Sequence, residues 1–235
     1  QENQENQESL SFSYMSDVIL QTAYVSLFVQ IVAGLIGLYG ISLSIAPQYY
    51  VLKELLIMET VVQAIEMVYY VWLTFNFTSL KYDVTFTRYF DWVLSTPIML
   101  TSTALYMNYR HQPDDSLWEG FRRNSTSLTG ILSWNFLMLL FGFLGERGVC
   151  SRTTAFLGGS IALLASFAWL YVSFVGGDWV NWLLFAFMFF VWALYGVAFC
   201  FDYRTKNAFY NVLDLFSKNF YGVFLFLEVW KLRER

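Results

Sequence analysis

The chain has 235 residues, of which 57% are hydrophobic, 21% aromatic and 14% charged, and its formal net charge is −4. A soluble domain of this length does not need so much apolar surface, so the composition predicts a membrane protein with several spans. There is no basic face that would suit a nucleic acid. The two cysteines, Cys150 and Cys200, are too few for a disulfide framework, and a single bridge between them is not favoured.

Residues 1–16 open with the polar repeat QENQENQES, which cannot bury a core and predicts a solvated tail. Seven apolar runs follow, each about long enough to cross roughly 30 Å of hydrocarbon as a helix. The predicted spans are residues 17–43, 51–75, 86–107, 127–144, 153–175, 179–201 and 207–230. We therefore expect an all-α bundle of seven helices within the lipid bilayer over residues 17–230, followed by a short tail at 231–235.

An odd number of crossings puts the two ends of the chain on opposite sides of the membrane. Basic residues favour the cytoplasmic side, and they occur in the loop 108–126 and in the C-terminal tail. The opposite loops hold nearly as many, so the bias is small: Lys81, Arg147, Arg152, Arg204 and Lys206. The pattern favours an extracellular N-terminus and a cytoplasmic C-terminus.

The segment 76–87 (NFTSLKYDVTFT) alternates polar and apolar residues and is rich in β-branched ones. This pattern predicts a short extracellular β-hairpin between the second and third helices. Asn76 also begins an N-x-T glycosylation sequon on that outer side, whereas the sequon at Asn124 is expected inside and unused.

The second span carries a row of polar residues on an otherwise apolar helix. Glu59, Gln63, Glu66 and Tyr70 follow an i, i+4, i+7, i+11 pattern and so share one face. At about 1.5 Å per residue, Glu59 and Glu66 lie roughly 10 Å apart along the axis. One interpretation is a ladder of hydrogen bonds between helices. The other is a cation path, because stacked carboxylates can replace the hydration shell of an ion.

The third and seventh spans each bury an acid near a base. Arg88 and Asp91 are three residues apart on one face of the third span, and Asp214 and Lys218 are four apart in the seventh. Ionisable groups inside a span cost a few kcal/mol, roughly 2.5–3.5 on insertion scales, and are functional hypotheses by default. The structural alternative is an ion pair between neighbouring helices. Together the four residues predict a site for a permanent internal cation.

The motifs R-Y-x-D-W-x-x-S-T-P (88–97) and D-x-x-x-K-N (214–219) resemble the third and seventh helices of microbial (type 1) rhodopsins. The resemblance implies that Lys218 carries all-trans retinal as a Schiff base. It makes Asp91 and Asp214 the counterions, with Arg88 beside them. Asp91 is then expected to accept a proton after illumination, while Asp214 stays ionised.

The sixth span reads W-x-x-Y-G-x-x-F over 192–199, which puts its three aromatic residues on one face. Such stripes in membrane helices are more often packing than cofactor contacts, but this one resembles the sixth helix of the same family, with Gly196 where a proline is usual. Asn135 stands where a carboxylate is common, and Phe156 where a tryptophan is frequent. The retinal contacts implied by the resemblance are Trp92, Thr96, Asn135, Met138, Gly142, Phe156, Trp192, Tyr195 and Phe199.

The polar row of the second span resembles the glutamate-rich second helix of algal cation channelrhodopsins, with Glu66 as a central-gate glutamate and Asn219 as a gate asparagine. Ser26 is the candidate that completes this gate, on spacing alone. The compact chain is closer in style to the viral channelrhodopsins of large algal viruses. The implied function is a light-gated channel for monovalent cations and protons, not an enzyme. Its path would run from Glu59 past Gln63 and the Ser26, Glu66 and Asn219 gate, which hydrogen bonds close in the dark.

A light-driven outward proton pump is the alternative. Such a pump places a carboxylate donor eleven residues after the acceptor, and here that position is Ser102. Paired glutamates are also missing at the outer end, where Arg204 and Lys206 stand. Glu59 could replace the donor, so a slow pump stays open. A sensory rhodopsin with a separate partner and a seven-helix transporter with coincidental motifs are further alternatives. The sequence also leaves assembly into a homo-oligomer open.

Overall fold

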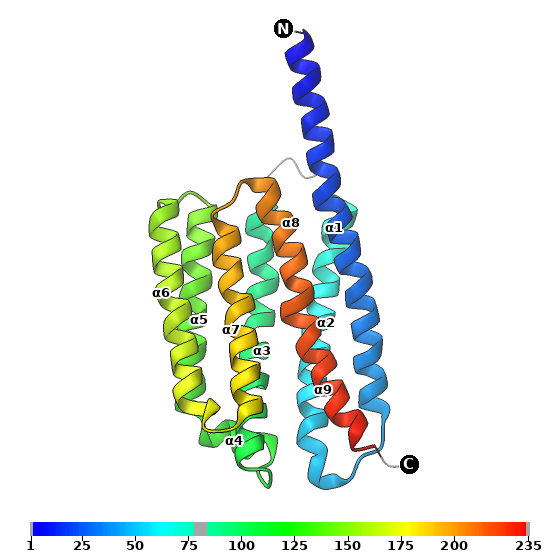
Figure 1. Ribbon diagram of the computed structural model, residues 1–235, viewed down its shortest axis with the longest axis vertical. Helices are drawn as coiled ribbons and strands as arrows, with labels where there is room; N and C mark the ends of the chain where they lie inside the picture. The colour runs from blue at the N-terminus through cyan, green and yellow to red at the C-terminus, as the bar shows by residue number, and fades with distance from the viewer. Residues whose placement is uncertain (1, 78–83, 234–235) are drawn as a thin grey trace.

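Each apolar run of the sequence forms a helical rod, because a helix satisfies its own backbone hydrogen bonds inside hydrocarbon. The computed structural model describes residues 2–77 and 84–233, and it describes the side chains of α1 from Val18 onward. Within these residues seven rods run up and down a bundle (Figure 1). The rods are α1 (Glu2–Ser42), α2 (Tyr50–Asn76), α3 (Arg88–His111), α5 (Ser125–Glu146), α6 (Arg152–Leu170) with the π turn η3 (Tyr171–Val175), α7 (Trp179–Phe199), and a seventh rod made of α8 (Tyr203–Asp214), the π turn η4 (Leu215–Asn219) and α9 (Phe220–Lys231).

Among the described residues, five segments are long and apolar enough to cross a membrane by length and composition alone, namely Val18–Ser42, Pro47–Asn76, Ser125–Glu146, Arg152–Val175 and Trp179–Phe199. The other two predicted spans are α3 and the seventh rod. In α3 many buried residues are hydroxyl-bearing or charged, and the seventh rod is divided by its π turn. These two rods are less apolar because they carry the buried ionisable residues.

The rods are arranged so that α3 and the seventh rod face α2. Helix α2 packs against α1, α3 and α9, while α5 packs against α6 at the other edge of the bundle (Figure 1). Helix α1 projects beyond the other rods at one end, and α9 ends at the opposite end, as an odd number of crossings requires. Residues 2–16, expected as a solvated tail, continue α1 as helix.

The connection between α2 and α3 does not confirm the predicted hairpin. Asn76 is the last residue of α2, and Thr85–Thr87 form a short 3₁₀ turn before α3. The middle of the predicted hairpin, residues 78–83, lies outside the described residues. The described residues contain no β-strand, only an isolated bridge between Ile45 and Arg233.

Short elements close the remaining connections. They are the 3₁₀ turn η1 (Pro47–Tyr49) before α2 and the helix α4 (Leu117–Arg123), which starts with a capping box between Ser116 and Glu119. Such a box satisfies two free backbone N–H groups reciprocally. Cys150 and Cys200 are both free thiols, so the bridge that the sequence did not favour is not formed.

Candidate functional site

Lys218 lies at the centre of the bundle on the π turn η4, and only 2% of it is exposed. Single π turns occur frequently at functional sites. Its Nζ lies 2.5 Å from Asp91 Oδ2, 3.4 Å from Glu66 Oε1 and 3.7 Å from Asp214 Oδ1. The sequence predicted the two aspartates. It assigned Glu66 to the ion path only, and the structure brings this third carboxylate to the lysine as well.

Arg88 is the second buried cation of the site, with Nη1 at 3.7 Å from Asp214 Oδ2. Three carboxylates thus face two cations. An uncompensated charge in a low-dielectric interior is expensive, so the cluster either keeps one excess negative charge or holds a proton on one carboxyl. Both states can be reached by moving a single proton, which suits a site that changes its charge.

Two asparagines that the sequence analysis missed hold Arg88 in place. Its Nε donates to Asn207 Oδ1 at 3.0 Å, and its Nη2 donates to Asn211 Oδ1 at 2.6 Å. Tyr70 accepts from Arg88 Nη1 at 3.4 Å and donates to Asp214 Oδ2 at 2.7 Å. We call Arg88, Tyr70, Asn207, Asn211 and Asp214 the Arg88 cluster.

The Arg88 cluster also ties in the first helix. Asn211 Nδ2 donates to Ile19 O at 3.0 Å and to Thr22 Oγ1 at 2.7 Å, both on α1. A signal for these asparagines existed in the sequence. Asn207, Asn211, Asp214 and Lys218 repeat the i, i+4, i+7, i+11 spacing of the polar row on α2, so they share one face of the seventh rod.

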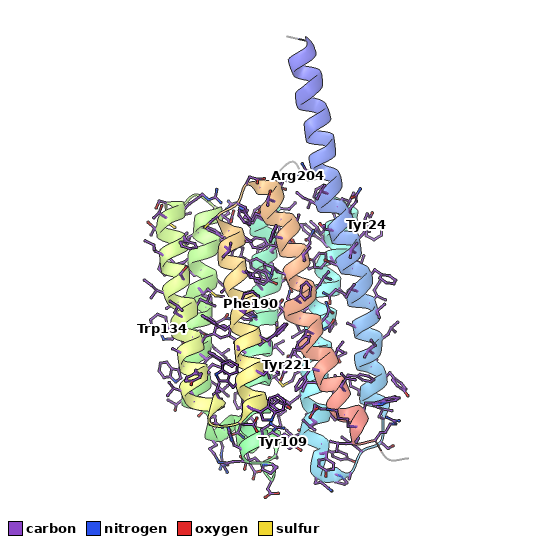
Figure 2. All side chains as sticks on the ribbon, in the orientation of Figure 1. Tyr24, Tyr109, Trp134, Phe190, Arg204 and Tyr221 are labelled. Atoms are coloured by element: carbon purple, nitrogen blue, oxygen red, sulfur yellow. The ribbon has the colours of Figure 1, made fainter. Side chains whose placement is uncertain are left out.

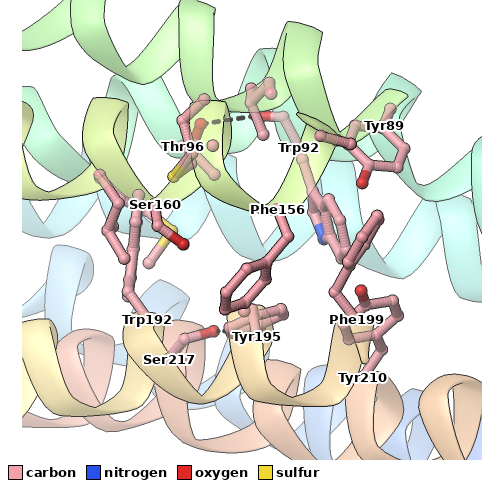
Figure 3. A pocket seen from close by; sticks show the side chains of 18 of the residues that line it. Tyr89, Trp92, Thr96, Phe156, Ser160, Trp192, Tyr195, Phe199, Tyr210 and Ser217 are labelled. Atoms are coloured by element: carbon pink, nitrogen blue, oxygen red, sulfur yellow. Dashed lines mark hydrogen bonds between the residues drawn. The ribbon is translucent and has the colours of Figure 1, made fainter. Parts of the chain in front are cut away.

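A cavity extends from Lys218 between α3, α5, α6 and α7, and its walls are mostly apolar. The predicted residues that line it are Trp92, Thr96, Met138, Gly142, Phe156, Trp192, Tyr195, Phe199 and Lys218. Figure 3 shows Phe156 pointing into the cavity toward Tyr195, with Trp192 and Phe199 to either side.

Asn135 was predicted as a contact but does not line the cavity. Its Nδ2 donates to Thr96 Oγ1 at 2.9 Å, so it lies behind Thr96 and orients that hydroxyl group. The lining residues that the sequence analysis did not assign are Tyr89, Met99, Leu139, Ala155, Gly159, Ser160, Leu163, Gly196, Tyr210 and Ser217. Several of them lie one turn away from assigned residues on the same helix face, which is the signal that could have found them.

The residues of this site fit retinal, which is an apolar aldehyde. The amine of Lys218 lines the cavity and can bond to an aldehyde carbon. Aromatic and aliphatic side chains form most of the remaining wall, and the carboxylates beside Lys218 compensate a positive charge on its nitrogen. Tyr195 donates to Asp214 Oδ1 at 2.6 Å and so joins the cavity wall to the carboxylates.

The polar row of α2 faces the interior along its whole length, as predicted. Gln63 Nε2 donates to the backbone oxygen of Lys218 at 3.2 Å, and Glu59 Oε1 accepts a hydrogen bond from Ser102 on α3. Both residues are buried. The row therefore connects Ser102 to Lys218 and, through Tyr70, to Asp214.

The hydrogen bonds expected among Ser26, Glu66 and Asn219 are not present. Ser26 donates to the backbone oxygen of Asn211 at 2.8 Å. Asn211 lies eight residues before Asn219, or about 12 Å along a helix. Ser26 of α1 is at the level of Asn211 and therefore cannot reach Asn219. Glu66 is attracted by the charge of Lys218 instead. The side-chain amide of Asn219 is buried and has no hydrogen-bond partner in the described part of the chain.

On the other side of Lys218 from the Arg88 cluster lie Glu59, Ser102, Thr103, Tyr106 and Tyr221, which we call the Glu59 cluster. All five are buried, and the Tyr221 hydroxyl is next to Glu59, Ser102 and Thr103. Glu59 Oε2 and the hydroxyls of Thr103, Tyr106 and Tyr221 have no hydrogen-bond partner within residues 2–77 and 84–233. Buried polar atoms without a protein partner commonly bind water or ions.

Comparisons with known proteins agree on one family. A family model described as bacteriorhodopsin-like protein matches residues 20–232. The solved structure of the viral rhodopsin OLPVRII is 26% identical, with a TM-score of 0.82, and the match covers 92% of this chain and 99% of that chain. No match was found among curated proteins.

More distant structures share the fold. Exiguobacterium sibiricum rhodopsin is 16% identical with a TM-score of 0.75, and the match covers 94% of this chain and 98% of that chain. The blue light-absorbing proteorhodopsin from Med12 is 17% identical with a TM-score of 0.69, over 91% and 96% of the two chains.

Proposed function

The chain belongs to the bacteriorhodopsin-like family of microbial rhodopsins, and on that premise we propose that it is a light-gated channel for monovalent cations and protons. The proposed chromophore is all-trans retinal, bound to Lys218 as a protonated Schiff base. In this proposal the N-terminus is extracellular and the C-terminus cytoplasmic, following the basic residues near the C-terminal end. When bound, retinal supplies the absorption of visible light and a light-driven change of shape.

The observation that carries the channel proposal is the buried polar row of α2. Glu59, Gln63, Glu66 and Tyr70 all face α3 or the seventh rod, and their partners run from Ser102 to Asp214. A row of this length offers oxygen atoms to a cation across much of the bundle. If the row were only a ladder of hydrogen bonds between helices, all of its polar side-chain atoms would have partners. Here Glu59 Oε2 and Gln63 Oε1 have no partner among the described residues.

The two aspartates beside Lys218 have different surroundings, which supports different roles. Asp214 accepts hydrogen bonds from Tyr70 and Tyr195 and lies 3.7 Å from Arg88, so both of its oxygens have partners. Asp91 Oδ1 has no hydrogen-bond partner in the described residues, so a proton can be held there. We therefore assign proton acceptance to Asp91 and permanent negative charge to Asp214.

A light-driven outward proton pump is the second candidate, and one contact favours it. Ser102 takes the position of the usual donor, yet it hydrogen-bonds Glu59, so a carboxyl group from α2 occupies the donor region. At the opposite end Lys206 is bound by both oxygens of Glu146, at 2.8 and 2.7 Å. A glutamate locked to a lysine is poorly suited to releasing protons, and this weakens the pump candidate.

Voltage clamp under illumination separates the two candidates. Cells expressing the chain receive retinal, and sodium is exchanged on one side at constant pH. A channel gives a photocurrent that reverses sign with voltage at a potential that follows the sodium gradient. An outward current that never reverses and ignores sodium would replace the channel by the pump. Lys218→Ala, which removes the attachment point, is the control and should give neither visible absorption nor photocurrent.

A further inference from the structure

The polar row on α2 ends at Glu59. The next inward-facing residues toward the C-terminal end of the bundle are Leu55 and Leu52, both buried and apolar. Tyr106 of α3 and Tyr221 of α9, two members of the Glu59 cluster, also lie in this part of the bundle. Figure 2 shows Tyr221 on the seventh rod, in the half of the bundle away from the projecting end of α1. A path along the row therefore meets apolar and aromatic side chains here.

Three aromatic rings join α3 to α9 at this point. The rings of Tyr221 and Phe224 are stacked, with centroids 6.2 Å apart and planes at 19°. The rings of Tyr106 and Phe224 meet edge to face at 5.2 Å and 80°. Both geometries are favourable for aromatic pairs. The same stretch of α9 packs closely on α2, since a Cβ at Gly222 would lie 3.1 Å from Gln63 Nε2.

The two tyrosines of this group face different polar surroundings, and both are buried, with 1% of Tyr106 and 0% of Tyr221 exposed. The Tyr221 hydroxyl lies next to Glu59, Ser102 and Thr103. On the far side, Tyr106 borders the charged residues Arg110 and Glu228 near the end of the bundle.

We propose that Tyr106, Tyr221 and Phe224 form an aromatic plug, which is the inner constriction of the cation path. The plug separates the polar space around Glu59 from the charged mouth at Arg110 and Glu228. Because it consists of rings from two helices, the ring volume limits the size of the cation that passes. This inference rests on the proposed function, and it adds the residues that set size selectivity.

The test compares two phenylalanines on the same helix, two residues apart. Phe224 contacts both tyrosines of the plug. The ring of Phe226 instead lies 6.3 Å from Tyr39 and 5.7 Å from Trp230. Photocurrents of the full-length, retinal-loaded chain are recorded with sodium on one side and methylammonium on the other. Phe224→Ala should raise the permeability of methylammonium relative to sodium several-fold, because a large ring is removed from the constriction.

The control Phe226→Ala removes the same atoms outside the plug and should keep the wild-type permeability ratio. Visible absorption of each variant reports folding, and Phe224→Leu is used if the alanine variant does not bind retinal. Tyr221→Phe keeps the ring and should also keep the ratio. Equal ratios in Phe224→Ala and Phe226→Ala, with a normal wild-type photocurrent, would overturn the plug alone. A wild type without any reversing photocurrent would overturn the channel proposal and the plug together.

Discussion

The Arg88 cluster and the Glu59 cluster lie on either side of Lys218 and take their residues from the same three rods, α2, α3 and the seventh rod. They differ in how completely their polar atoms are hydrogen-bonded. In the Arg88 cluster, Arg88 donates to Asn207, Asn211 and Tyr70, and Asn211 donates to the first helix. In the Glu59 cluster, four buried oxygen atoms have no partner in the described residues. If the proposed path exists, protein hydrogen bonds close one half of it, whereas side-chain packing closes the other half and leaves polar atoms for water or ions.

The largest effect should come from removing the charge at the centre of the Arg88 cluster. Arg88→Gln leaves Asp214 with less compensation and removes the guanidinium donor from Asn207 Oδ1 and Asn211 Oδ1. Breaking a buried charged network by removing one partner costs about 3–5 kcal/mol. Thermal or denaturant unfolding of the retinal-loaded protein in detergent measures this loss. Arg110→Gln changes an exposed arginine of the same helix and should cost less than about 1 kcal/mol; equal losses would contradict the comparison.

A pair of asparagines on the seventh rod tests the comparison with the same chemical change. Asn211→Leu removes an acceptor from Arg88 and a donor from Ile19 and Thr22, and leaving such groups unpaired costs about 1–3 kcal/mol. Asn219→Leu removes a buried amide that has no partner among the described residues, so its stability should change little or increase. The free energies of unfolding of both variants, measured under the same conditions, test this difference. A larger loss for Asn219→Leu would contradict the contrast between hydrogen-bonded and unpaired amides on the seventh rod.

Much of this arrangement could be predicted from residue spacing. The seven spans follow from the length of the apolar runs. The row from Glu59 to Tyr70 and the pairing of Asp214 with Lys218 follow from helical periodicity, whereas the link of Asp91 to Lys218 was implied by the family resemblance. Predicting the Arg88 cluster would have required knowing which helix faces lie opposite each other. Asn207 and Asn211 are informative only once α3 is known to face them. Ser26 was misplaced because spacing within one helix does not give its level relative to another.

The π turn at Lys218 could not be read from the sequence either. Residues 215–219 have no proline or glycine that marks a local change, and the turn depends on packing of the seventh rod. The same holds for Glu66, whose face was predicted correctly but whose distance of 3.4 Å to Lys218 depends on how closely α2 approaches η4. Charge attraction between the two groups then makes Glu66 part of the lysine site as well as of the proposed path.

A smaller effect is expected in the Glu59 cluster. Glu59→Gln keeps an oxygen that can accept from Ser102, and it replaces Oε2, which has no partner in the described residues, by an amide group. The free energy of unfolding should therefore change by less than about 1 kcal/mol. Glu54→Gln on the exposed face of α2 is the control. A loss as large as that of Asn211→Leu would mean that Glu59 is fully bonded in the protein, and the contrast between the halves would fail.

The smallest effect concerns a charge pair beyond the Glu59 cluster, in the loop before α7. Asp178 accepts from Arg110 Nη2 at 2.7 Å and from the backbone N–H groups of Val180 and Asn181 at the start of α7. The hydrogen bond from Arg110, followed by those from the backbone, lowers the pKa of Asp178 below its usual value of 3.8. Its stabilisation is therefore complete above about pH 4 and disappears as the pH falls through the lower folded-state pKa.

Because Asp178 and Arg110 are partly exposed, the pair should contribute less than about 1 kcal/mol. Asp178→Asn should lower the unfolding temperature slightly at about pH 7, and the difference from the wild type should disappear as the pH falls through the lowered pKa of Asp178. High salt should shrink the difference at neutral pH, since exposed charges are screened. A large, salt-independent loss would mean that this end of α7 is held by a buried charge. In that case the half of the bundle that contains Glu59 would be closed by electrostatics in addition to packing.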